Sequence, residues 1–78
     1  MGKESNIVHQ YFKKEIPEGK ILVQLNPIHL KGIEIFVSGE EVEKRELTFD
    51  GEILEDLKHD GFTEVNALEF NLYLSGLL

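Results

Sequence analysis

The chain of 78 residues contains no cysteine and no tryptophan. Without cysteine, disulfide bonds, thiolate metal sites and cysteine nucleophiles are excluded, and the composition favours a cytoplasmic setting. No apolar run approaches the ~18 residues that a membrane-spanning helix needs. The formal charge is −7, with eight basic residues against fifteen acidic ones. This balance argues against a nucleic-acid-binding protein, because such proteins neutralise phosphates with an excess of positive charge.

The remaining composition is that of a folded domain. Hydrophobic residues make up 41% of the chain and charged residues 29%, which are ordinary proportions for a globular protein. We expect a single small domain over 1–78, in which residues 1–4 are disordered. A chain of this length buries only about 60% of its unfolded surface. A partner that covers further apolar surface would therefore stabilise it.

The segment 5–15 has the apolar spacing of one α-helical stripe. The residues on this stripe are Ile7, Val8, Tyr11 and Phe12. Ser5 precedes them as an N-cap, and Pro17 disfavours helical geometry at the residue before it. The pattern predicts a first helix that ends before a turn beginning at Pro17.

A second helix is predicted after Asp50, whose side chain suits an N-cap. Its apolar stripe consists of Ile53, Leu54 and Leu57. Gly61 supplies a left-handed residue for the end of the helix, and Phe62 just beyond it can make the hydrophobic contact that accompanies such an end.

Four further segments alternate between apolar and polar residues, as half-buried β-strands do. They are residues 20–26, 33–38, 42–49 and 66–74. Because the outward positions are mostly polar, we expect only one covered sheet face and reject a sheet covered on both. The predicted fold is α+β: a two-layer sandwich with a four-stranded, mostly antiparallel sheet and two helices on one face, in the order α-β-β-β-α-β.

One group of side chains has the residue types of a metal or catalytic site. Glu55 and His59 are four residues apart on the second predicted helix, with Asp56 beside them, and such spacing places side chains on one helical face. Carboxylates and imidazole can bind a divalent metal or hold a general base. No further ligand is identifiable, and a solvated acidic face with a histidine near the helix end explains the same pattern. We predict no catalytic residue, no cofactor and no bound metal, and name these three as the candidates should a metal bind.

Four apolar side chains fall where the alternation predicts solvent. They are Leu22, Phe36, Val42 and Tyr73. Phe36 and Val42 flank the same hairpin loop, so we expect them to touch. Such a cluster marks a protein interface, although cross-strand pairing that stabilises the hairpin explains it equally well. The acidic residues that would select the partner are Glu40, Glu41, Glu43 and Glu46.

The charge is unevenly distributed along the chain. Residues 1–31 contain five lysines and three glutamates, whereas residues 32–78 contain three basic and twelve acidic residues. A basic strip of Lys13, Lys14 and Lys20 could meet the acidic region of a second subunit, although solubility also explains the acidity.

The sequence therefore predicts a small acidic, non-enzymatic module that binds proteins and forms a homodimer, with no nucleic-acid or membrane partner. The alternative is a metal- or small-ligand-dependent enzyme subunit that uses the group on the second helix. A third hypothesis is an acidic decoy for a nucleic-acid-binding protein.

Overall fold

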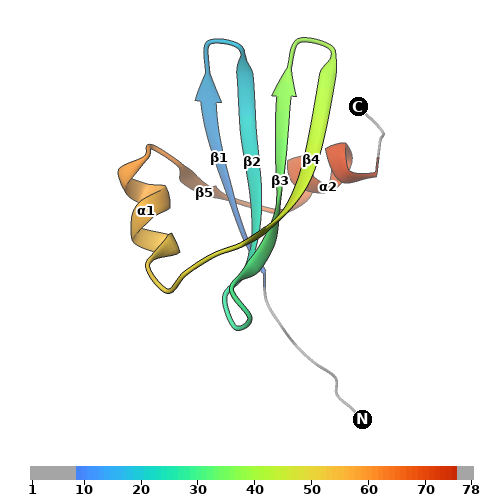
Figure 1. Cartoon of the computed structure of the whole chain (residues 1–78). Coiled ribbons are helices and arrows are strands. Elements are labelled where there is room, and N and C mark those ends of the chain that lie inside the picture. The colour runs from blue at the N-terminus through green and yellow to red at the C-terminus, as the bar shows by residue number, and fades with distance from the viewer. Residues whose placement is uncertain (1–8, 76–78) are drawn as a thin grey trace.

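The structure is a computed structural model, and it describes residues 9–75. Its elements are β1 (Gln10–Ile16), β2 (Gly19–Asn26), β3 (Lys31–Ser38), β4 (Glu41–Thr48), α1 (Ile53–His59), β5 (Thr63–Val65) and α2 (Leu68–Leu74). The five strands form one antiparallel sheet in the order β4-β3-β2-β1-β5 (Figure 1). The predicted four-stranded sandwich with two helices on one face is therefore wrong, as is the order α-β-β-β-α-β.

The predicted helix over 5–15 is wrong, because residues 10–15 lie in strand β1. This strand lies between β2 and β5. Its neighbours Tyr11 and Phe12 pack into different clusters of apolar residues, because successive side chains of a strand point to opposite faces. Adjacent apolar residues of this kind resemble the spacing of a helical stripe. The predicted N-cap Ser5 and the predicted disorder of residues 1–4 lie outside the described residues.

The turns that join the first four strands contain even numbers of residues. Residues 17–18 join β1 to β2, residues 27–30 join β2 to β3, and residues 39–40 join β3 to β4. An even loop pairs odd-numbered with even-numbered residues, so Leu22 lies opposite Ile35 and Ile21 lies opposite Phe36. Directly paired residues share a face. The odd-numbered apolar residues of β2 therefore point to one face of the sheet, and those of β3 point to the other.

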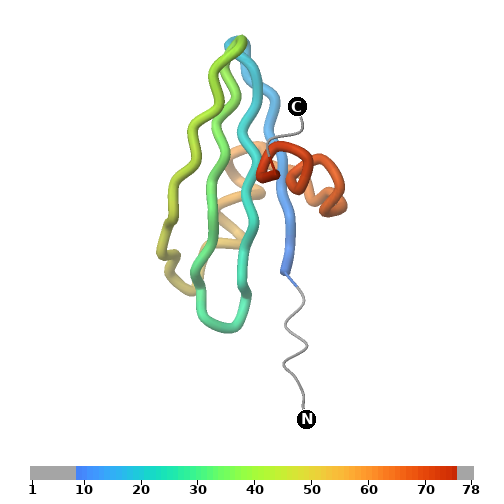
Figure 2. The backbone as a smooth tube through the Cα atoms, turned by 90° about the vertical axis from the view of Figure 1, so that its right-hand side faces the viewer, coloured from blue at the N-terminus to red at the C-terminus, as the bar shows by residue number. Residues whose placement is uncertain are grey.

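Both faces of the sheet are consequently apolar, and each is covered by one helix (Figure 2). On the α1 face, Leu57 packs in a cluster with Phe12, Val23 and Leu25. On the α2 face, the ring of Phe70 packs in a second cluster. The sheet residues of that cluster are Leu22, Ile35 and Val37. The expectation that only one face would be covered is wrong, because it placed the odd-numbered residues of all strands on the same side.

Helix α1 ends as its sequence predicts. Gly61 has a φ of 91°, the left-handed conformation that glycine adopts without steric cost. The N–H of Gly61 donates to the carbonyl of Lys58, and the N–H of Phe62 donates to that of Leu57, which is the hydrogen-bond pattern of a Schellman motif. Phe62 packs against the cluster that contains Leu57, so the predicted hydrophobic contact is confirmed. The prediction that Asp50 caps the start of the helix is wrong, because the N-cap is Glu52. Asp50 lies two residues earlier, where its carboxylate accepts the N–H of Glu52 at 3.0 Å.

The last predicted strand, residues 66–74, is also wrong. Residues 63–65 form the short strand β5, and residues 68–74 form α2. The side chain of Asn66 accepts the N–H of Leu68 at 3.0 Å at the start of this helix. Phe70 and Tyr73 are three residues apart and both belong to the cluster on the α2 face, as expected for one helical face. Within residues 9–75, neither helix has the length and hydrophobicity needed to span a membrane.

Candidate functional site

Two of the four predicted interface residues belong to the apolar cluster on the α2 face of the sheet. Leu22 has no exposed surface and packs with Phe70 beneath α2. Tyr73 lies on α2 itself and packs against the same cluster. Neither side chain is in the outward sheet position from which its interface role was predicted.

The other two lie on opposite faces of the sheet, and the expectation that they touch is wrong. Phe36 is paired with Glu43 on the α1 face, whereas Val42 is paired with Val37 on the α2 face. Phe36 lines a hollow of about 320 Å³ together with Ile21, Glu34, Glu43 and Arg45. Val42 keeps 39% of its surface exposed. The four residues therefore form no single docking surface.

The candidate metal ligands Glu55, Asp56 and His59 are all exposed on α1. Among residues 9–75, no group of three or more His, Cys, Asp or Glu side chains is arranged to hold a metal ion. Among these residues, the structure therefore brings no further metal-ligating side chain to Glu55, Asp56 and His59. That the protein has no catalytic residue, cofactor or metal stays a prediction.

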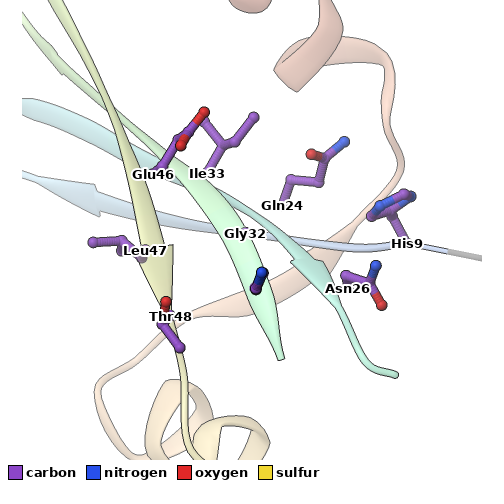
Figure 3. Close-up of a pocket in the computed structure, with 9 residues that line it drawn as sticks. His9, Gln24, Asn26, Gly32, Ile33, Glu46, Leu47 and Thr48 are labelled. Atoms are coloured by element: carbon purple, nitrogen blue, oxygen red, sulfur yellow. The ribbon is translucent and has the colours of Figure 1, made fainter. Parts of the chain in front are cut away.

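A hollow of about 490 Å³ lies at the end of the sheet near the turn between β2 and β3 (Figure 3). Its polar lining includes His9 just before β1, Gln24 of β2 and Glu46 of β4. Gln24 donates a hydrogen bond of 3.0 Å to the hydroxyl of Tyr11. Within the described part of the chain, no hydrogen bond joins the side chains of two residues of this lining. The hollow has polar residues but no organised acid–base pair.

Two lysines of the predicted basic strip bind a carboxylate of their own chain. Lys13 donates to Glu69 at 3.0 Å, and Lys20 also binds Glu69 while its ammonium lies 4.8 Å from the ring centre of Tyr73. The hydrogen bond from Lys20 lowers the pKa of Glu69, and the same bond together with one to Tyr73 raises the pKa of Lys20. Lys14 lies over the ring of Phe62. Lys13 and Lys20 link β1 and β2 to α2, and Lys14 contacts a residue beyond the end of α1, roles that were not predicted.

The sheet ends in two edges of very different length. Strand β5 has three residues, whereas β4 has eight and pairs with β3 along its full length. The N–H of Phe49 donates to the carbonyl of Leu30 at 2.7 Å, just beyond the end of this ladder. Since hydrogen-bonded pairs alternate along an antiparallel ladder, the odd-numbered residues of β4 bond to β3. The even-numbered ones turn their N–H and C=O groups outward. These residues are Val42, Lys44, Glu46 and Thr48.

Side chains of both charges lie along this edge strand. Arg45 binds Glu34 at 2.8 Å on the α1 face, and Lys44 donates to the carbonyl of Leu74 at 3.0 Å on the α2 face. The predicted acidic docking residues are all exposed, three of them in β4 and one in the turn before it. They are Glu41, Glu43, Glu46 and Glu40. The edge position of β4 was not predicted, although its many charges and few apolar residues are typical of an exposed edge strand.

No family model, no curated protein and no solved structure matches this chain. A function has to be argued from the faces and edges of the sheet. Of these, the edge of β4 is the longest surface with unpaired backbone groups among the described residues.

Proposed function

We propose that this protein is a small non-enzymatic interaction module that self-associates by strand addition at the edge of β4. The observation that carries the proposal is the row of outward backbone groups on an eight-residue edge strand. Addition of a strand to such an edge gives affinity through main-chain hydrogen bonds and specificity through the side chains beside them. The opposite edge, β5, offers only three residues.

The charges of β4 determine which strand can be added. Charged side chains on an edge discourage pairing with unrelated strands, because like charges placed opposite each other are destabilising. A partner must therefore present opposite charges in register. The chain's acidity also disfavours nucleic acid as that partner, and the lack of cysteine keeps the cytoplasm as the proposed compartment.

The proposal is tested by sedimentation equilibrium on the full chain between about 10 μM and about 1 mM. We expect the mass to rise with concentration from 8.9 kDa toward twice that value. A Glu46→Pro variant removes an outward N–H without removing a bond to β3, since proline is tolerated at such edge positions. We expect this variant to remain monomeric, with a circular dichroism spectrum like that of the wild type.

The matched control is Phe36→Gln, which changes the hollow on the α1 face and leaves the edge intact. We expect it to associate like the wild type. A chain that stays monomeric over the whole range would contradict the proposal, and so would a Glu46→Pro variant that associates as strongly as the wild type. Loss of association in Phe36→Gln alone would place the interface on the sheet face.

A further inference from the structure

We infer that two copies of this chain join edge to edge with their β4 strands antiparallel, around a two-fold axis beside Arg45. Lys44 then lies opposite Glu46 of the partner subunit. This inference rests on the proposed function and specifies the geometry of the dimer. The result is one continuous sheet of two five-stranded halves.

Symmetry limits the registers that are available. A two-fold axis perpendicular to the sheet is required to pair the same edge with itself in antiparallel orientation, and it keeps each face on its own side. Since residues directly opposite each other share a face, even-numbered residues of one β4 must pair with even-numbered residues of the other. Only an axis beside Arg45 or one beside Lys44 centres the contact within Glu41–Thr48.

The axis beside Arg45 uses all of the outward backbone groups. Val42 pairs with the partner's Thr48, and Lys44 pairs with the partner's Glu46, and symmetry repeats both pairs. All are hydrogen-bonded pairs, each with two hydrogen bonds. The ladder therefore leaves no outward residue of β4 without a partner.

The side chains favour the same register. Two Lys44–Glu46 pairs of opposite charge form, and the methyl groups of Val42 meet those of the partner's Thr48; favourable cross-strand pairs of this kind stabilise a sheet. Arg45 lies opposite the partner's Arg45, but each guanidinium already binds Glu34 of its own chain at 2.8 Å.

The axis beside Lys44 is less favourable. It gains two pairs between Glu43 and the partner's Arg45, but it places Lys44 opposite the partner's Lys44 and Val42 opposite the partner's Glu46. It also leaves Thr48 outside the strand-to-strand ladder. Each register contains two pairs of opposite charge and one pair of like charge, and like charges directly opposite destabilise a sheet. With the axis beside Arg45, the like charges are each compensated by Glu34, and this axis also forms more hydrogen bonds.

The helices leave this edge accessible. In Figure 2, β4 forms the outer margin of the sheet and neither helix lies beyond it. Lys44 donates a hydrogen bond to the carbonyl of Leu74 at the end of α2. An ammonium group has three donors, so Lys44 can keep this bond and still pair with the partner's Glu46.

Single cysteines test the register directly, because the chain has no cysteine of its own. In the proposed register, Arg45 and the partner's Arg45 form a non-hydrogen-bonded pair with Cα atoms about 4.5 Å apart, within the range of a disulfide. Lys44 and the partner's Lys44 are offset by two residues along the strands, beyond that range. We expect Arg45→Cys to form a disulfide-linked dimer under mild oxidation, at least about tenfold faster than the matched Lys44→Cys variant.

Charge exchange provides a second measurement. Glu46→Lys and Lys44→Glu each create two like-charge pairs, so we expect each to weaken self-association about tenfold. Mixing these two variants, or combining both changes in one chain, restores opposite charges at both sites. We expect both to recover association to within about threefold of the wild type.

The outcomes separate the register from the proposed function. If the wild type dimerises but Lys44→Cys cross-links faster, or if the double exchange does not recover association, the register is wrong and the interaction module stands. If the wild type is monomeric and neither cysteine cross-links, both are wrong. Cross-linking of Arg45→Cys together with recovery in the double variant supports the proposed register.

Discussion

The two faces of the sheet are covered by helices of equal length that are held in different ways. α1 and α2 have seven residues each. On the α1 face, Leu57 of the helix is joined by Phe49 and Phe62 from the segments before and after it. On the α2 face, Phe70 is the one fully buried side chain of the helix, and Glu69 binds two lysines of the sheet.

The difference shows where each helix is specified. α1 is bounded by local signals, with Asp50 before it and Gly61 after it. α2 depends on what the sheet provides, namely a space for Phe70 and two cations for Glu69. A helix of this length is marginal by itself, so α2 should be more sensitive than α1 to the loss of one contact.

The largest effect is expected from Phe70→Ala. The ring is 1% exposed and is the centre of the cluster on the α2 face, so its removal should lower the free energy of unfolding by about 3–5 kcal/mol. Urea unfolding followed by circular dichroism measures this loss. The matched control is Leu68→Ala in the same helix, where the side chain is 66% exposed. Equal losses in the two variants would show that α2 is not anchored through Phe70.

Leu57→Ala should cost less, about 2–4 kcal/mol. Leu57 is buried, but Phe49 and Phe62 also cover this face and should keep part of the contact in place. Leu54→Ala in the same helix is the control, because Leu54 is exposed. The measurement is again urea unfolding under the same conditions. A larger loss for Leu57→Ala than for Phe70→Ala would reverse the comparison between the faces.

Glu69→Gln tests the ionic part of the α2 face. Removing the charge should lower the free energy of unfolding by about 1 kcal/mol at pH 7. Because its pKa is lowered in the folded state, Glu69 stabilises the fold above its ordinary pKa of 4.5, and this contribution is lost as the pH falls through the lower, folded value. The pKa of Lys20 is raised, so its share persists below its ordinary value of 10.5 and is lost as the pH rises through the higher, folded value.

Urea unfolding at a series of pH values therefore distinguishes this variant from the wild type. The difference between them should be constant near neutrality and shrink at both extremes. The exposed carboxylate of Glu55 on α1 provides the control, as Glu55→Gln. A difference that does not change with pH would show that Glu69 acts through packing and not through its charge.

The smallest effect is expected from Gly61→Ala at the end of α1. A side chain at a φ of 91° costs about 1 kcal/mol, although nothing lies closer than 3.8 Å to the added methyl group. Gly51→Ala is the control, since Gly51 has open space and no positive φ. Thermal unfolding of the two variants should give a lower midpoint for Gly61→Ala only. Equal midpoints would show that the left-handed end contributes nothing to α1.

The sequence predicts the parts of this fold that depend on neighbouring residues. The hairpins β2–β3 and β3–β4 and the end of α1 follow from turn and capping residues such as Gly39 and Gly61. The hairpin of β1 and β2 was not predicted, because residues 5–15 were expected to form a helix. The number of residues in each turn determines the register of the strands, and the register places apolar residues on both faces of the sheet. It could have been used to reject the single covered face.

The sequence does not predict the parts that depend on distant contacts. The alternating residues Leu68, Phe70 and Leu74 resemble a strand, yet Leu68 and Leu74 are exposed and only Phe70 is buried. β1 resembles a helix because both of its faces are covered, which a local pattern cannot show. The candidate site could not be predicted for the same reason. The faces on which Phe36 and Val42 lie depend on the register of the strands, and the edge position of β4 depends on the strand order.

Strand β5 comes late in the sequence but pairs with β1, the first strand of the described chain. The hydroxyl of Thr63 donates to the carbonyl of Lys13, across 50 positions of the sequence. The hairpins of residues 10–48 contain only contacts between successive strands, which form quickly. During synthesis, β1 leaves the ribosome before β5, so the outer edge of β1 stays open until residues 63–65 follow. For that interval the nascent sheet has two long open edges, and this is when pairing with other chains is easiest.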